Sequence, residues 1–337
     1  MKYNEYANCK MKHQLAPPCG RKMESLPIIL VHQGNSPYLE VCLRQARQTN
    51  PRSRIVWLHG EKDRPLDFVD CFCFHEPELF QDVALFSSIY QHLSSSNSLE
   101  SERFCIQRWL IVRNFMRREK ITRALAIDSD VLIFCNVTQE AERFRPYAMT
   151  FAHWNATQNL IHCNFIQDFS ALEAFADYSM EVYQNSELLE RLKQTSRKGK
   201  NRYRVSDMSL FYDWSTHSDY PFCFFEDFYP DGIFFDSCID FVQDFKAIRY
   251  LPGLLHPFKN IIWKEGIPHA TLKTSTLKGG LQAPMKIIHY HGGLKFLMPF
   301  HFQRRSPHVE IFKQLLLQKL KNLPARWRRI WNRNANG

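Results

Sequence analysis

The 337-residue sequence contains no run of 18 consecutive apolar residues, so it lacks the uninterrupted hydrophobic stretch that a transmembrane helix needs. It also contains no internal repeat and no long low-complexity tract. Apolar residues nevertheless make up 45% of the chain, which is enough to bury a large core. Because α/β proteins of this length often fold as one unit, the sequence favours a single large domain.

The N-terminal segment lacks the apolar core of a secretory signal peptide, since residues 1–23 carry scattered charges and the pair Pro17-Pro18. We therefore expect three parts. Residues 1–24 are a flexible leader, residues 25–303 form the folded body, and residues 304–337 form a basic amphipathic tail.

No CxxC pair occurs among the ten cysteines. Several of them, such as Cys42, Cys105 and Cys135, lie within apolar runs, where a thiol behaves as a small hydrophobic group. This pattern favours a reduced, cytosolic protein over a disulfide framework or a structural zinc site.

An acid-x-acid motif, Asp128-Ser129-Asp130, lies between the apolar runs 124–127 and 131–134 and follows a helical stretch at 103–120. Because a strand alternates its faces, the two carboxylates are expected to point the same way where the sheet meets solvent. Two convergent carboxylates at the carboxyl edge of an α/β sheet form a candidate cation site. The alternative is an ordinary solvated turn.

A second motif occurs about 160 residues later, where residues 286–295 read KIIHYHGGLK and indicate a short apolar strand followed by a tight glycine turn. His289, Gly292 and Lys295 are three residues apart in this segment. A neutral imidazole can bind a transition metal such as Mn²⁺. Glycine lets the backbone approach a phosphate and accepts positive φ, and lysine supplies a compact positive charge.

Together the two motifs resemble the DxD and HxxGxxK motifs of the family-eight retaining glycosyltransferases, which have the GT-A fold. The resemblance implies a GT-A-like, Rossmann-like α/β domain whose mixed, mostly parallel sheet is flanked by helices. It also implies transfer of a sugar from a nucleotide diphosphate sugar, with a UDP-sugar as the expected donor, to a hydroxyl of a glycan or glycolipid. Asp128, Asp130 and His289 would hold Mn²⁺ or Mg²⁺, and Lys295 and the Gly292 backbone would contact the diphosphate.

Further donor-site candidates follow from the same resemblance. The first apolar run, 26–32, leads through a helical pattern at 38–48 to a second strand at 54–59, a β-α-β opening that builds a parallel sheet. The loop after the first strand cups the base in GT-A proteins. By position, the candidates in this loop and at the start of the next helix are Gln33, Asn35 and Tyr38. Arg108, on the helix before the DSD motif, is a further candidate for binding the nucleotide, and the alternative is that it lies on a solvated helix face.

Two residues are candidates for the chemistry itself. Asn164 lies in a stretch, 147–166, whose aromatic, His and Asn residues suit sugar hydroxyls; family-eight enzymes have an Asn-small-Gly segment here, whereas Cys163-Asn164-Phe165 has no glycine. That departure leaves retention open against inversion with a general base. Asp207 follows Ser206 at an expected helix start and is the candidate acceptor contact or base, unless it only complements the helix dipole.

The tail carries nine Lys or Arg against one acid between residues 304 and 333, a net charge of +8. Its apolar residues form one helical stripe, at positions 309, 312, 316, 320, 323, 327 and 330. This predicts a helix on an anionic membrane surface, consistent with a lipid-linked acceptor and a cytoplasmic protein at the inner face of the membrane. For the tail, the alternative is docking on the protein's own core. For the whole protein, the alternative is a non-catalytic adaptor that binds a membrane or a nucleic acid through the tail. The transferase interpretation expects no nucleic-acid partner.

Overall fold

The computed structural model describes residues 24–34, 36–93, 97–196, 205–249, 257–273, 280–306 and 308–321. The expected leader, except Glu24, and the distal tail, 322–337, lie outside the described residues. No helix in the described part of the chain is both long and apolar enough to cross a membrane.

The main sheet confirms the α/β prediction. Its strand order is β3-β2-β1-β4-β8-β6-β7, with β9 beside β6. The first four strands in this order are parallel, and the chain turns antiparallel where β4 meets β8. The strands are β1 Ile28–His32, β2 Ile55–His59, β3 Asp70–Cys73, β4 Ala124–Ile127, β6 Met149–Asn155, β7 Gln158–Leu160, β8 Cys163–Ile166 and β9 Phe222–Phe224.

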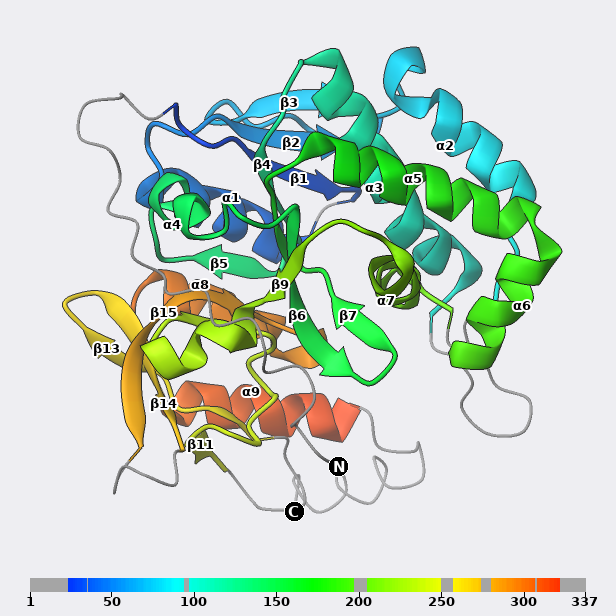
Figure 1. Ribbon diagram of the computed structural model, residues 1–337. Helices are drawn as coiled ribbons and strands as arrows, with labels where there is room; N and C mark the ends of the chain where they lie inside the picture. The colour runs from blue at the N-terminus through cyan, green and yellow to red at the C-terminus, as the bar shows by residue number, and fades with distance from the viewer. Residues whose placement is uncertain are drawn as a thin grey trace, which may run out of the picture.

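A second sheet packs next to the first (Figure 1). Its order is β10-β15-β14-β13, and β5 pairs antiparallel with β15. The strands are β5 Val131–Ile133, β10 Phe234–Phe235, β13 Ile262–Lys264, β14 Ile267–Leu272 and β15 Leu281–His289, and a separate pair is formed by β11 Ala247–Ile248 and β12 Phe258–Lys259. The strand expected near residues 286–289 is therefore longer, and a 3₁₀ helix rather than a tight turn follows it.

The helices cover the two faces of the main sheet separately. One apolar core joins its face to α2, α3, α5, α6 and α7, and a second core joins the opposite face to α1, the second sheet, α8 and α9 (Figure 1). The helices are α1 Pro37–Thr49, α2 Pro77–Ile89, α3 Leu99–Arg118, α4 Val137–Arg143, α5 Phe169–Gln184, α6 Ser186–Thr195, α7 Asp207–His217, α8 Met298–Phe302 and α9 His308–Lys321, and the 3₁₀ helices are η1 Phe225–Asp231 and η2 Gly292–Leu297.

Local sequence explains why α3 begins earlier than expected. The Ser98 side chain accepts a hydrogen bond from the Ser101 N–H, which caps a free backbone donor of the first turn. Acidic residues in the first turn and arginines in the last complement the helix dipole. The helix therefore runs from Leu99 to Arg118 and carries Arg108 near its middle.

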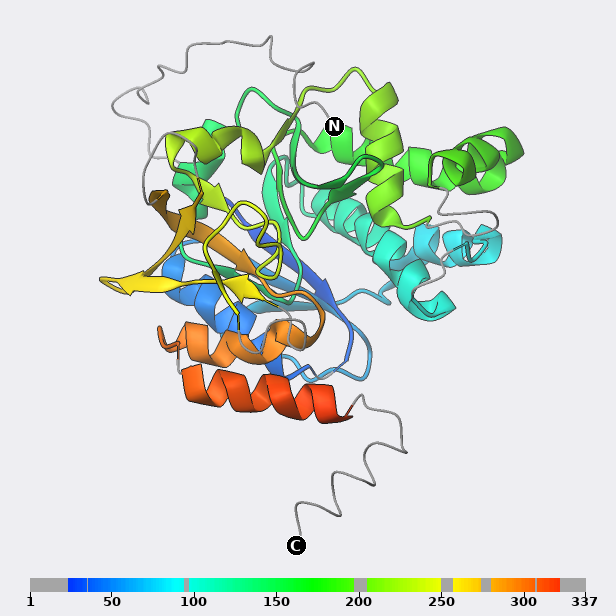
Figure 2. The same cartoon turned by 90° about the horizontal axis from the view of Figure 1, so that it is seen from below.

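The described part of the tail is docked on the protein. Ile311 and Leu315 of α9 are buried in the same core as α1 and the second sheet, and Figure 2 shows α9 as the outermost described helix on that side. Val309 and Leu317 are 61% and 50% exposed. The buried edge of the helix, at 311 and 315, is therefore offset from the expected stripe, and α9 shows the docking on the protein's own core that was the alternative.

Replacing Ile311 by Ala should lower the free energy of unfolding by about 2–5 kcal/mol, because it removes buried methyl groups and leaves a cavity. Leu317→Ala, on the exposed side of the same helix, is the matched control and should change it by less than about 0.5 kcal/mol. Urea unfolding measures both. Equal, small losses in the two variants would mean that α9 is not docked in solution.

Candidate functional site

The DSD motif lies in the connection between the two sheets, and this corrects the expectation that strand alternation aligns its carboxylates. Ser129 and Asp130 form a turn between β4 and β5, closed by the Val131 N–H donating to the Asp128 carbonyl at 3.3 Å. The Asp128 N–H donates to the His162 carbonyl at 2.8 Å, and the Asp130 carbonyl accepts from the Tyr290 N–H at 2.9 Å. The two acidic residues are thus held by different sheets.

Strand pairing brings the distant motif to this turn. Because β15 pairs with β5, His289 lies opposite Val131, the residue after Asp130. His289 Nε2 is 3.7 Å from Asp130 Oδ1, and Lys295 Nζ is 2.8 Å from Asp130 Oδ2. The structure therefore brings together three residues that the sequence analysis assigned to one site.

The surroundings of Asp130 suit a divalent cation. Burial acts to raise the pKa of Asp130, but His289 and Lys295 outweigh it and hold that pKa below its ordinary value. Asp130 Oδ1 is buried and has no hydrogen-bond partner. His289 Nδ1 lies 2.7 Å from the Ser237 carbonyl, which accepts its proton, so Nε2 is the ring nitrogen that faces Asp130 and that a cation would take. An unpartnered carboxylate oxygen and an imidazole lone pair form a fitting donor set.

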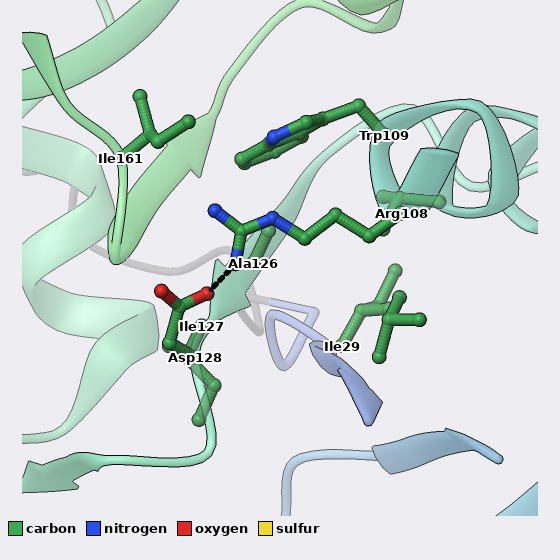
Figure 3. Close-up of a pocket in the computed structure, with 9 residues that line it drawn as sticks. Ile29, Arg108, Trp109, Ala126, Ile127, Asp128 and Ile161 are labelled. Atoms are coloured by element: carbon green, nitrogen blue, oxygen red, sulfur yellow. Dashed lines mark hydrogen bonds and ion pairs between the residues drawn. The ribbon is translucent and has the colours of Figure 1, made fainter. Parts of the chain in front are cut away.

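Arg108 links the other two acidic candidates. Its guanidinium pairs with Asp128, as Figure 3 shows, and donates from Nη2 to Asp207 Oδ2 at 2.9 Å. Burial raises the pKa of both carboxyls, and the charge of Arg108 opposes that rise. Arg108 therefore faces the site and is not part of a solvated helix face.

Asp128 is not gathered closely with the other two proposed metal ligands. The ligand atoms of Asp128, Asp130 and His289 do not all lie within 4.8 Å of one another, judged over the described residues. Binding of one ion by all three therefore requires at least one of these side chains to move.

Three of the remaining candidates for donor binding, Tyr38, Gly292 and Gln33, lie in the described part of the chain. Lys295 Nζ is 4.7 Å from the ring centre of Tyr38 and 3.5 Å from its hydroxyl, so Tyr38 borders the site. Gly292 has φ +55°, and a Cβ there would meet no atom within 4 Å, so its backbone is open to approach. Gln33 is exposed in the loop after β1. Asn35 lies outside the described residues.

Asn164 is fully buried on β8, where it pairs with Ala126 of β4. Its side-chain amide donates to the Thr150 carbonyl at 2.5 Å, and its Oδ1 has no partner. The structure does not bring this side chain to an exposed surface of the site, because it is fully buried. Direct contact between Asn164 and a substrate therefore stays a sequence prediction.

Sequence reasoning missed the layer that supports His289. His162 stacks on the His289 ring at 4.1 Å between centres, with an angle of 6° between planes. The backbone carbonyl of Asp236 lies 2.9 Å from His162 Nε2. The side-chain carboxylate of Asp236 accepts hydrogen bonds from the His289 N–H at 3.2 Å and from Lys259 Nζ at 2.5 Å. Asp236 is therefore engaged in holding His289.

His32, at the end of β1, was also missed. Its Nδ1 is 3.0 Å from Ser129 Oγ and its Nε2 is 3.0 Å from Ser36 Oγ, so it connects the DSD turn to the start of α1. Burial lowers the pKa of His32 and favours the neutral ring. A polar residue at the carboxyl end of the first parallel strand is the signal that could have identified it.

Comparisons with known proteins add a likeness of fold. Neither a protein-family model nor a curated protein sequence matches this chain. Among solved structures, it is similar to the galactosyltransferase LgtC in complex with donor and acceptor sugar analogs, with 13% identity, a TM-score of 0.42, and 90% of this chain and 99% of that chain covered. Mouse xyloside xylosyltransferase 1 is 11% identical, with a TM-score of 0.42 and coverage of 59% and 84%.

The bifunctional glycosyltransferase WbbM is 12% identical, with a TM-score of 0.42 and coverage of 90% of this chain and 53% of that chain. Such low values do not establish an activity. The function must therefore be argued from the site itself.

Proposed function

We propose that this chain is a metal-dependent glycosyltransferase that moves a sugar from a nucleotide diphosphate sugar, with a UDP-sugar as donor, to a hydroxyl of a glycan or glycolipid. The observation that carries the proposal is the meeting of Asp130 with His289 and Lys295, which lie about 160 residues later in the chain, with one buried carboxylate oxygen that has no hydrogen-bond partner. A cation-binding pair beside a fixed lysine suits a diphosphate.

The proposed roles follow from these contacts. Asp128, Asp130 and His289 would hold Mn²⁺ or Mg²⁺, which supplies positive charge against the leaving diphosphate. Lys295 and the open backbone of Gly292 would bind the same phosphate oxygens. Tyr38 borders Lys295 and would limit the donor pocket on that side, and the neighbouring Gln33 and Asn35 keep their proposed place near the base.

Arg108 and Asp207 would serve the sugar side of the site. Arg108 is shared between Asp128 and Asp207, and it would become available to the donor once a metal ion balances the charge of Asp128. Asp207 would then contact the acceptor hydroxyl. A retaining outcome is proposed; inversion with Asp207 as general base is the alternative, because burial raises its pKa toward the range of a base. The anomeric configuration of the product, read by NMR, separates the two.

The cytoplasm, with contact to an anionic membrane through the basic tail, remains the proposed location. Docking of α9 restricts the candidate membrane contact to the rest of residues 304–337, and vesicle sedimentation at low salt tests it.

The proposal is tested by a thermal-shift screen of nucleotide sugars with and without Mn²⁺. A ligand at 100 times its Kd adds about 2.7 kcal/mol of stability, which should raise the Tm by about 2 °C or more. We expect this rise for a UDP-sugar with Mn²⁺, and a smaller one without metal. A Tm that no nucleotide sugar changes, with Mn²⁺ or Mg²⁺ present, would favour the non-catalytic adaptor.

A further inference from the structure

A second group of metal-ligating side chains lies beside the DSD site. Cys238 Sγ, a carboxylate oxygen of Asp240 and His291 Nδ1 all lie within 4.8 Å of one another. In the part of the chain that the structure describes, this is the one set of three His, Cys, Asp or Glu ligand atoms gathered so closely. Cys238 and Asp240 lie outside the DSD and HxxGxxK motifs, and His291 occupies a variable position of HxxGxxK.

The backbone holds this group firmly. Cys238 and Asp240 flank Ile239, which is buried in the core and whose N–H donates to the His289 carbonyl at 2.9 Å. His291 follows two residues after that carbonyl. Lys259 also fixes the segment, because its N–H donates to the Ile239 carbonyl at 2.8 Å and its Nζ to the Cys238 carbonyl at 2.6 Å. The three ligands thus come from two hydrogen-bonded segments.

The spacing of the ligand atoms is close to that of a tetrahedral zinc site. Bond lengths of about 2.3 Å to sulfur and 2.0 Å to nitrogen or oxygen place neighbouring ligand atoms roughly 3.3–3.5 Å apart. The distance from Cys238 Sγ to Asp240 Oδ1 is 2.7 Å, and that from Asp240 Oδ2 to His291 Nδ1 is 3.9 Å. The two distances involve different oxygens of Asp240. With one ligand atom per residue, the three atoms lie within 4.8 Å of one another, so a rotation of the Asp240 carboxylate and small shifts of its neighbours would bring them to this spacing.

Burial runs from the interior to the surface across the group. Cys238 is fully buried, Asp240 is partly exposed, and the His291 side chain is 61% exposed. An ion can therefore enter from the His291 side and keep one coordination position open to solvent. Burial and the neighbouring Asp240 raise the pKa of the Cys238 thiol, which donates to Asp240 in the absence of metal; an ion would replace this proton.

We propose that Cys238, Asp240 and His291 bind one Zn²⁺ ion, with a fourth coordination position left open. The thiolate determines the choice of metal, because soft sulfur selects zinc over the Mg²⁺ or Mn²⁺ that oxygen-rich sites prefer. The site is separate from the proposed donor site and does not depend on it. Its ion would connect the segment after β10 to the end of β15, which carries His289.

Titration of the full-length, reduced protein with Co²⁺ tests the proposal, because thiolate ligation gives a near-ultraviolet charge-transfer band that carboxylate and imidazole ligands do not. We expect one equivalent of Co²⁺ to produce this band and Zn²⁺ to remove it. Cys238→Ser should abolish the band, and His291→Ala should weaken Co²⁺ binding at least 10-fold. Cys71→Ser and Asp130→Asn, which alter a different thiol and the DSD site, should retain it.

The proposal is overturned if the wild-type protein gives no such band, or if His291→Ala binds Co²⁺ as tightly as wild type. His291 is largely exposed, so this variant should fold even if Cys238→Ser does not. In either case the group is only a thiol–carboxylate hydrogen bond with an imidazole nearby.

Discussion

Asp130→Asn should abolish the Mn²⁺-dependent binding of UDP while leaving the fold intact. The amide keeps the size of the side chain but removes the charge that faces His289 and Lys295. We expect the affinity for UDP in the presence of Mn²⁺ to fall 100-fold or more, which corresponds to about 2.7 kcal/mol. The freed Lys295 can still meet a diphosphate, so weak, metal-independent binding should remain. Isothermal titration calorimetry with and without Mn²⁺ measures both.

Asp70→Asn is the matched control for this variant, because Asp70 is an exposed carboxylate on β3 that pairs with Arg54. It should bind UDP and Mn²⁺ as wild type does. His289→Ala should weaken metal affinity in the same direction as Asp130→Asn. The metal-site proposal fails if wild-type protein binds UDP equally well with and without Mn²⁺.

The largest loss of stability is expected from Lys259→Met. Lys259 and Asp236 form an ion pair whose side chains are 1% and 0% exposed, with Nζ 2.5 Å from Oδ1. Methionine fills a similar volume but leaves the Asp236 carboxylate buried without a counter-charge, which costs about 3–5 kcal/mol. Urea unfolding should show this loss, and the support of His289 by Asp236 should weaken with it.

Two comparisons make this prediction specific. Lys264→Met, on the exposed strand β13, should change stability by less than about 0.5 kcal/mol. The double variant Lys259→Met with Asp236→Asn should recover part of the loss, because no unpaired charge remains. If Lys259→Met lowers the free energy of unfolding by less than about 1 kcal/mol, water reaches Asp236 and the ion pair is not shielded from solvent.

The sequence was sufficient for the order of elements near the N-terminus and for the central motif residues. The runs 26–32, 38–48 and 54–59 became β1, α1 and β2 within two residues at each end, because apolar periodicity and the Asn, Pro and Ser residues in the breaks between them are local signals. The DSD and HxxGxxK motifs, taken together, predicted that Asp130, His289 and Lys295 share one site. Strand pairing places these residues close together.

Other features depend on contacts that no local pattern encodes. The turn at Ser129 joins two sheets, so the alternation expected of one continuous strand did not apply. The pairing of Arg108 with Asp207 spans 99 residues, and that of Lys259 with Asp236 joins two segments without a recognisable motif. In the tail, the position of the helix relative to the core selected Ile311 and Leu315 for burial rather than the regular stripe.

The pairing of β5 with β15 has a consequence for the order in which the molecule matures. During synthesis, Asp128 and Asp130 emerge about 150 residues before Leu281, the first residue of β15. Until that strand is made, β5 lacks the neighbour with which it pairs, and Asp130 lacks both His289 and Lys295. Closing so long a loop is slow compared with forming local helices. The cation-binding centre is therefore assembled late, and nascent chains that end before β15 have the acidic turn without the groups that hold it.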